Sequence, residues 1–490
     1  MNLSKSKYCN AFQCMKMLWL YKNKPDVIES VDNSSVLENG REVGEVAKTL
    51  FGDYIDIEYG NLSKMIIDTN NAISNNSVCN ICEASFNYNN NFCSVDILRK
   101  NNDNYEIYEV KSSTGVKDIY LEDVSYQYYV LTSLGYKVTK AFIVYINRDY
   151  VRHGELEINK LFNIEDVTDT CISKLEEVSN RISDINKFMN QKDEPEDMVS
   201  ENCFDPYLCP FFKYCTKHLS SPNVFDISGM WKSKMIEYYN KEITSFKDLI
   251  NEDLNPTYLE QVDFEINNKP DKIEIDEIKD FISTLSYPLY FLDFETYQQT
   301  IPLYDGISPY QQIPFQYSLH YIEEVDGNLK HTEFLAESGV DPRRSLAEAL
   351  VKDIPMDVCT LAYNMSFEKM VISDLAELYP DLEEHLLNIH KNMKDLRVPF
   401  LKRNYYNKLM KGRNTIKYVL PALFPNDPEL DYHNLEGVHN GSEAMNAFAN
   451  LDKLSKEEQL IVRNNLLKYC GLDTYAMVKI YYKLLEVIGE

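Results

Sequence analysis

Two acidic residues, Asp293 and Glu295, follow an apolar run that begins at Tyr287. The run predicts a buried strand, and residues two apart on a strand point to the same side. The two carboxylates are therefore expected side by side, where their repulsion is costly unless they share a cation. Two later acids, Glu368 and Asp473, stand where they can join this cluster. Four carboxylates suit Mg²⁺ or Mn²⁺, and two such ions are a common device for cleaving phosphodiester bonds.

Two further elements must position the later acids. A short strand is expected over 358–363, followed by a helix that carries Glu368. A long helix is expected from about Lys456 to Val487. On that helix Tyr469 and Asp473 are four residues apart, so they share one face.

In this order the three segments resemble the motifs of the DEDD exonucleases of the RNase H-like superfamily, and the Tyr-x3-Asp spacing resembles its tyrosine branch. The resemblance implies 3′→5′ exonuclease action, two metal ions held by the four acids, and Tyr469 as the residue that orients the attacking water. The second motif of that family usually ends in Asp, where this chain has Glu368. The alternative is an ordinary α/β domain with acids at strand and helix ends, in which Asn364 caps a helix.

A basic segment, Lys391 to Lys417, lies between the second and third acidic motifs. It holds nine basic residues against one acid in a chain whose net charge is −27, and four aromatic residues are interleaved with them. This combination suits a groove that contacts phosphates and stacks bases, although a solvated helix face is the alternative. The basic residues expected to bind nucleic acid are Arg397, Lys402, Arg403, Lys411, Arg413 and Lys417, and the aromatic ones are Phe400, Tyr405, Tyr406 and Tyr418.

A second candidate centre lies in the first half of the chain and consists of Asp96, Glu109 and Lys111. Asp96 falls in a predicted strand, 92–98, and the other two residues share one face of the next predicted strand, 105–113. An amphipathic helix is expected to follow. An Asp on one strand with Glu-x-Lys on the next resembles the PD-(D/E)XK nucleases.

That resemblance implies a metal ion held by the carboxylates of Asp96 and Glu109. It implies that Lys111 steadies the attacking water and the charge that develops on the phosphate. It also implies that Glu83, ahead of the Asp96 strand, is a further acid of the metal site.

Four cysteines extend the resemblance. Cys14 lies in the opening helix, and three cysteines follow the predicted nuclease core. One early and three late cysteines resemble the RecB-type nucleases with an iron–sulfur cluster, including the CRISPR-associated exonucleases, which implies a 4Fe–4S cluster bound by Cys14, Cys203, Cys209 and Cys215. Two alternatives are a zinc ion bound by the same thiolates and a different metal site built from Cys79, Cys82 and Cys93.

These motifs predict three parts and an α/β fold class. A PD-(D/E)XK restriction-endonuclease-like domain is expected over 1–220, a partly helical connector over 221–280, and an RNase H-like domain of the DEDD exonuclease type over 281–490. As a whole the chain resembles an uncharacterised bacterial family that fuses an iron–sulfur RecB-type nuclease to a DEDD-type exonuclease.

The composition sets the remaining expectations. No run of about 18 apolar residues and no signal peptide is found, so we expect a cytoplasmic protein with reduced thiols and no membrane partner. The negative net charge argues against a protein that coats DNA generally. The predicted function is a metal-dependent nuclease with two active centres, acting on DNA more than on RNA. The competing hypothesis is a nucleic-acid-binding or redox-sensing iron–sulfur protein with one or both nuclease domains inactive.

Overall fold

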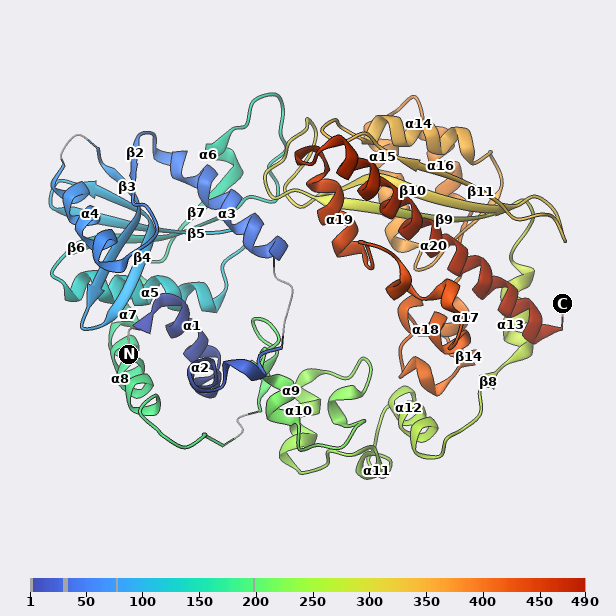
Figure 1. The fold of residues 1–490 in the computed structure, drawn as a ribbon, viewed down its shortest axis with the longest axis horizontal. Helices are drawn as coiled ribbons and strands as arrows, with labels where there is room; N and C mark the ends of the chain where they lie inside the picture. The colour runs from blue at the N-terminus through green and yellow to red at the C-terminus, as the bar shows by residue number, and fades with distance from the viewer. Residues whose placement is uncertain (1–2, 30–33, 76–77, 197–198, 490) are drawn as a thin grey trace. The chain divides into compact units, whose positions relative to one another are not determined.

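A computed structural model describes residues 3–29, 34–75, 78–196 and 199–489, and it has a mixed α/β architecture (Figure 1). The chain forms two compact units. The first contains Met1–Leu219 together with Gln299–Tyr310, and the second contains Ser220–Gln298 together with Gln311–Glu490. The first unit is thus discontinuous in sequence. The residues predicted as a connector, 221–280, are part of the second unit.

The first unit is built around one mixed sheet with the order β2-β3-β4-β5-β6-β7, in which the short β1 also pairs with β4. Strands β3, β4 and β5 form an antiparallel meander, and β6 returns parallel to β5 after helix α5. The strands are β1 (Leu3–Ser4), β2 (Tyr54–Asp56), β3 (Asn80–Tyr88), β4 (Asn91–Asn101), β5 (Asn104–Lys111), β6 (Lys137–Ile146) and β7 (Phe162–Asp166).

Helix α5, Asp118–Ser133, is the central helix of the first unit, and nine of its sixteen residues are buried. Helix α1, Lys5–Gln13, packs on α5, and the ring of Tyr8 stacks on Tyr126 with 4.8 Å between their centroids. The opening helix therefore lies against the element that follows β5. The other main helices are α2 (Met15–Asn23), α3 (Ser34–Lys48), α4 (Leu62–Ser74), α7 (Thr168–Ser173), α8 (Leu175–Phe188) and α9 (Phe212–Thr216).

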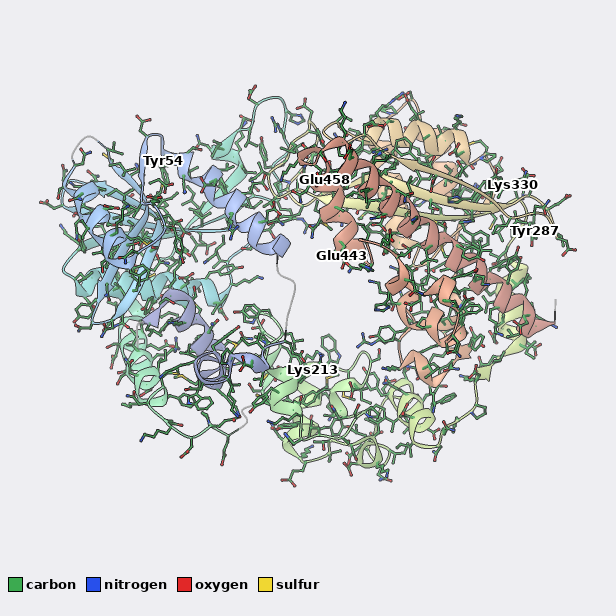
Figure 2. The ribbon with its side chains drawn as sticks, viewed as in Figure 1. Tyr54, Lys213, Tyr287, Lys330, Glu443 and Glu458 are labelled. Carbon is green, nitrogen blue, oxygen red and sulfur yellow. The ribbon has the colours of Figure 1, made fainter. Side chains whose placement is uncertain are left out.

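The second unit is built around a five-stranded sheet with the order β11-β10-β9-β12-β13. Strand β9 is central, antiparallel to β10 and parallel to β12. The edge strand β11 starts at the exposed Lys330 (Figure 2), and charge on an edge strand opposes pairing with other chains. The strands are β9 (Leu289–Gln298), β10 (Gln312–Ile322), β11 (Lys330–Leu335), β12 (Cys359–Ala362) and β13 (Met393–Asp395).

Alternation along β9 divides the core of this unit into two layers. Leu289 and Phe291 pack in a cluster with helix α20, whereas Tyr290, Leu292 and Phe294 pack in a separate cluster on the other face. The second cluster is covered by α14 (Arg343–Asp353), α15 (Ser366–Leu378) and α16 (Glu383–Lys391). Because Asp293 and Glu295 continue the first series, they are directed to the α20 side.

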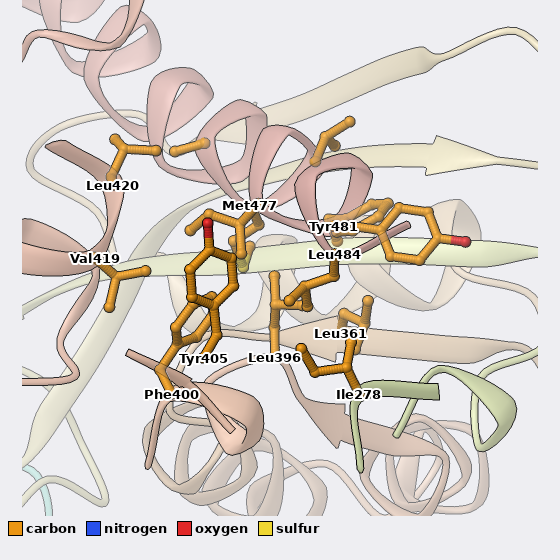
Figure 3. Packing of buried hydrophobic residues seen from close by; sticks show 14 of the residues in the cluster. Ile278, Leu361, Leu396, Phe400, Tyr405, Val419, Leu420, Met477, Tyr481 and Leu484 are labelled. Carbon is orange, nitrogen blue, oxygen red and sulfur yellow. The ribbon is translucent and has the colours of Figure 1, made fainter. Parts of the chain in front are cut away.

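Helix α20, Lys456–Ile488, is the longest helix in the part of the chain that is described. It starts with a capping box in which Ser455 and Glu458 (Figure 2) each bond the other's backbone N–H. Its apolar face packs on Leu361, Leu396 and residues of the basic segment (Figure 3). Ile278 of α13 (Ile275–Ser283) joins this cluster.

The predicted elements are present, and one of them is longer than expected. The sequence predicts a strand that ends before Asp293, but β9 runs on to Gln298 because Phe294, Thr296 and Tyr297 are buried. The two acids therefore lie within the central strand rather than beyond its end. Among the described residues, the helices are too short or too polar to cross a bilayer.

Candidate active sites

Three carboxylates of the second unit converge on one point. Asp293 and Glu295 project from β9, and Asp473 projects from α20. One oxygen from each lies within 4.8 Å of the others, and the described residues contain no other such group of three or more acids, cysteines or histidines. Glu295 is 8% exposed, so much of this charge is shielded from water.

The charge cluster raises the pKa of all three acids. Burial is the largest cause for Asp293 and Glu295, and the charge of Asp473 raises both values further. Burial also raises the pKa of Asp473 to about 6, while a hydrogen bond from Tyr432 and the charge of Lys417 oppose the rise. Such a cluster is costly when ionised alone and is relieved by a divalent cation.

Glu368 lies beside this group, in the first turn of α15. Its side chain is 3% exposed, and Oε2 has no hydrogen-bond partner among the described residues. Burial raises the pKa of Glu368 to about 8, and Asp395 contributes to the rise. The charge of Glu368 also raises the pKa of Asp293, although Glu368 is outside the group of three. A buried carboxylate oxygen without a donor is free to bind a cation.

Asp395 is a residue of this region that sequence reasoning did not select. It is the last residue of β13, which pairs with β12, the strand that leads to Asn364. Its Oδ1 accepts hydrogen bonds from the backbone N–H groups of Asn364 (3.0 Å) and Arg397 (2.9 Å). Asp395 is the single acid of the basic segment, and this isolated charge was the feature of the sequence that could have pointed to it. Asn364 has a φ of +74° and bonds Arg397 with its side chain, so it does not cap α15 as the alternative hypothesis held.

Two tyrosines and a lysine lie against the acids. Tyr432 donates a hydrogen bond of 2.6 Å to Oδ1 of Asp473, a contact that the sequence did not indicate. The Tyr469 hydroxyl helps to lower the pKa of Asp473, and the two tyrosine rings are 5.8 Å apart. Tyr432 and Lys417 line a cleft of about 580 Å³ in the same unit. The acid cluster therefore adjoins a cavity large enough for part of a substrate.

The basic segment divides into buried and exposed residues. Phe400, Tyr405 and Tyr406 are at most 3% exposed and pack under α20 (Figure 3), so the expectation that they stack bases is wrong. Arg403 is engaged with Glu260 at 2.9 Å. The exposed residues of the predicted nucleic-acid set are Lys402, Lys411, Arg413 and Lys417, and Arg397 is partly buried.

The first unit brings Asp96, Glu109 and Lys111 together with two residues of α5. Lys111 Nζ lies 2.7 Å from Oε1 of Glu109 and 2.7 Å from Oδ2 of Asp123. Gln127 donates to Glu109 and Asp123 at 2.7 and 3.0 Å. Asp96 accepts from the backbone of Val110 at 2.7 Å. Residues from two strands and one helix thus form a single polar cluster.

Two other residues complete this polar cluster. Lys5 of α1 places Nζ 3.3 Å from Oδ1 of Asp96 and 2.9 Å from Oε1 of Glu109. The sequence offered no signal for it, because a lysine in an opening helix is commonplace. Glu83 of β3 has a φ of +56°, and burial, followed by the charge of Asp96, raises its pKa to about 7. Burial and Asp96 raise the pKa of Glu109, but Lys111 and Lys5 outweigh them, so its pKa is lowered.

Of the four predicted cluster cysteines, Cys203 and Cys209 are buried, and Cys14 and Cys215 are half-buried. Cys14 ends α1, and Gln13 beside it donates to the carbonyl oxygens of Asn202 and Tyr207, which ties this helix to the late cysteines. The charges of Cys14 and Cys203 contribute to the raised pKa of Cys209, after burial. No three of these thiols lie within 4.8 Å of one another. The other thiols considered, Cys82 and Cys93, are buried within β3 and β4, and Cys79 is exposed.

Comparisons with known proteins match parts of the chain to sequences without a described activity. The profile of a domain of unknown function (DUF2779) matches residues 290–415, which include Asp293, Glu295 and Glu368 and end before Asp473. The uncharacterized protein UU173 of Ureaplasma parvum serovar 3 is 28% identical over 270 residues. That match covers 50% of this chain and 38% of UU173, so the chain spans well under half the length of this relative.

Proposed function

We propose that this protein is a metal-dependent nuclease with two active centres, one in each unit. The observation that carries the proposal is the convergence of Asp293, Glu295 and Asp473 within 4.8 Å, with the unsatisfied Glu368 beside them. Four clustered acids with raised pKa values have little structural use. They suit hard divalent cations, which prefer oxygen ligands.

The topology of both units supports nuclease folds by analogy. In the second unit the sheet order, numbered along the unit, is 3-2-1-4-5 with the second strand antiparallel, an arrangement that resembles the RNase H-like fold. In the first unit an antiparallel meander, a helix and a parallel strand resemble the PD-(D/E)XK core. We infer these two fold families for the chain.

In the second centre the acids would hold Mg²⁺ or Mn²⁺, which supplies Lewis-acid stabilisation for phosphodiester cleavage. The residues of the chain have separate tasks. Tyr469 orients the attacking water through its hydroxyl, and Tyr432 fixes the Asp473 carboxylate by the 2.6 Å bond. Lys417 stands at the adjoining cleft, where its charge attracts a substrate phosphate. By its resemblance to the DEDD enzymes, this centre acts as a 3′→5′ exonuclease.

In the first centre Asp96 and Glu109, with Glu83, would hold one divalent cation. Lys111 is held between two carboxylates, Glu109 and Asp123, so its ammonium group is charged and fixed in direction. It would orient the attacking water and stabilise the charge that develops on the phosphate. Gln127 keeps Glu109 in place by donating to Oε2.

We also propose that Cys14, Cys203, Cys209 and Cys215 bind a 4Fe–4S cluster. A zinc ion bound at 2.3 Å by each thiolate would bring the sulfur atoms to about 3.8 Å from one another. No three of the thiols lie within 4.8 Å of one another, so a zinc ion would require them to move closer together, and the choice of an iron–sulfur cluster rests on the cysteine pattern of the sequence. Bound there, the cluster would join the first helix to the end of the unit.

A specific observation favours the competing hypothesis for the first unit. The Lys5 ammonium contacts both Asp96 and Glu109, the two acids that would hold the cation. A lysine in that position neutralises the acids without a metal. The first unit would then bind nucleic acid without cleaving it, and the second centre alone would be active.

The proposal is tested with anaerobically purified protein and end-labelled single- and double-stranded DNA and RNA, in Mn²⁺ or in EDTA. Cleavage in Mn²⁺ that EDTA abolishes is expected, with DNA preferred. Lys111→Ala should remove one activity and Asp293→Ala the other. Loss of all cleavage in either single variant would contradict two independent centres, and no cleavage by the unmodified protein on any substrate would refute the nuclease assignment.

A further inference from the structure

A cleft of about 510 Å³ opens in the first unit, two residues beyond Lys111. Its charged lining residues are both cations, Lys117 and Arg148. The whole chain holds 77 acids and 50 basic residues, so a cleft whose charged lining residues are all positive is not expected from the composition. The remaining lining residues are Ser113, Thr114, Gly115, Val116 and Tyr310.

Both cationic side chains are available to a ligand. Lys117 and Arg148 are exposed, and neither makes an ion pair or hydrogen bond with its side chain to another described residue. Lys117 also lines an adjoining cleft of about 470 Å³, together with Asp118 and Asp205, whereas neither of these acids lines the first cleft. Lys117 also precedes the first turn of α5, where the positive end of the helix dipole adds to the attraction for an anion.

One aromatic ring connects the cleft to the first centre. The ring centroid of Tyr120 lies 5.3 Å from Nζ of Lys111 and 5.9 Å from Nζ of Lys117. Because both distances are measured to the same centroid, the two ammonium groups cannot be further apart than the sum of the two distances. Two ammonium groups within this limit can contact neighbouring phosphates of one strand.

Tyr310 also lines the cleft, and three contacts hold it in place. Its hydroxyl donates to the carbonyl oxygen of Ser112, its backbone N–H donates to Gln299 at 2.8 Å, and its ring packs on the core of the first unit. Its φ is +63°, a strained value for a tyrosine, which persists only because the surrounding contacts hold it. The cleft is therefore preformed, and its shape depends on the segment Gln299–Tyr310.

We propose that this cleft binds the backbone phosphates of the nucleic-acid strand that the first centre cleaves, with Lys117 and Arg148 as the phosphate contacts. The inference rests on the proposed nuclease function and adds the binding residues of the first centre. Another cleft of this unit provides a contrast. It measures about 420 Å³ and is lined by Asp56, Glu58 and Asp68 with a single cation, Lys64, so it would repel a phosphate.

The test uses the full chain with Asp293→Ala, so that only the first centre cleaves. In that background the double variant Lys117→Gln/Arg148→Gln should raise KM for a single-stranded oligonucleotide about tenfold and change kcat less than threefold. The slope of log(kcat/KM) against log[salt] should become shallower by about 1.4, since each phosphate contact contributes about 0.7. Lys117→Arg/Arg148→Lys should restore both values, because the charges are retained.

Lys192→Gln is the matched control, since Lys192 is an exposed lysine of the same unit in an acidic loop. It should leave KM and the salt slope unchanged. An unchanged KM and slope in the double variant would overturn the proposal. So would a fall in kcat alone, which would indicate an effect on Lys111 rather than on binding.

Binding in EDTA separates this proposal from the nuclease assignment. Fluorescence anisotropy of the labelled oligonucleotide should show the same loss of affinity and the same change in salt slope in the double variant. If the Asp293→Ala protein does not cleave, the activity of the first centre is refuted. The anisotropy result then decides by itself whether the cleft binds phosphates. Equal affinities of the Asp293→Ala protein with and without the double change would overturn the proposal.

Discussion

The ammonium group of Lys5 lies 2.9 Å from Oε1 of Glu109, in the position where a divalent cation would meet the acids of the first centre. The same nitrogen is 3.3 Å from Asp96. In the proposed first centre, Lys5 and a metal ion would therefore compete for two carboxylates. Burial lowers the pKa of Lys5, but the charges of Asp96 and Glu109 raise it well above its ordinary value, so the competitor is charged at neutral pH.

The first prediction concerns this competition. In an Asp293→Ala background, Lys5→Met should raise the apparent affinity of the first centre for Mn²⁺ about tenfold, or about 1.4 kcal/mol. The measurement is the thermal shift as a function of Mn²⁺ concentration. Lys22→Met, on the exposed surface of α2, is the control. Unchanged Mn²⁺ affinity with reduced cleavage at saturating Mn²⁺ would show instead that Lys5 takes part in catalysis.

The second prediction concerns Tyr469. Tyr469→Phe should lower turnover by the second centre about 10²–10⁴-fold, the usual range for a side chain positioned on the attacking nucleophile, with little change in stability. Single-turnover cleavage in a Lys111→Ala background is the measurement. Tyr432→Phe should mainly weaken Mn²⁺ binding, because it removes the donor that fixes Asp473. Normal turnover in Tyr469→Phe would mean that the tyrosine only packs against its neighbours.

The third prediction concerns pH. Burial raises the pKa of Asp473 to about 6 and of Glu368 to about 8, so the folded protein binds more protons than the unfolded chain above about pH 4. The free energy of unfolding without metal should therefore fall as pH rises from about 4.5 to 8, by of order 1–3 kcal/mol. Thermal melts of the second unit in EDTA measure this. In Glu368→Gln the free energy of unfolding should change less with pH in the upper part of this range. The same pH dependence in the variant and in the unmodified protein would contradict the prediction.

The fourth prediction concerns the cysteines. Anaerobically purified protein should be brown and contain about four irons and four sulfides per chain. Cys209→Ala should bleach it and lower the melting temperature of the first unit. Cys359→Ala, a buried thiol of the second unit, should keep the colour. A colourless protein that carries one zinc ion would establish the alternative metal.

The fifth prediction concerns the segment Gln299–Tyr310. Ile301 is 5% exposed and packs in the core of the first unit with Val43 and Phe162. Ile301→Ala should therefore destabilise the first unit by about 2–4 kcal/mol, the usual cost of such a cavity. Chemical denaturation followed by a probe in each unit measures this. Leu303→Ala, at a 53% exposed site nearby, should have little effect on stability. Equal destabilisation by both changes would contradict the assignment of Gln299–Tyr310 to the first unit.

The sequence was sufficient to predict individual strands and helices, and which side chains share a face, because these depend on residues close together in the chain. A continuous apolar run predicted β9, and the two-residue period of a strand placed Asp293 and Glu295 on one face; the helical spacing did the same for Tyr469 and Asp473. The order of elements indicated an α/β protein, as observed. Residue types also indicated where carboxylates would gather in the second unit.

Only the tertiary structure decided which distant residues complete each site. Lys5 and Asp123 join Glu109, and Tyr432 joins Asp473, because helices pack on sheets at positions that local periodicity does not encode. Packing also decided that Tyr405 belongs to the core, since a run of basic residues does not reveal which side of the chain is buried. It likewise assigned Gln299–Tyr310 to the first unit, because burial of Ile301 in that core is a long-range contact that no spacing along the chain predicts.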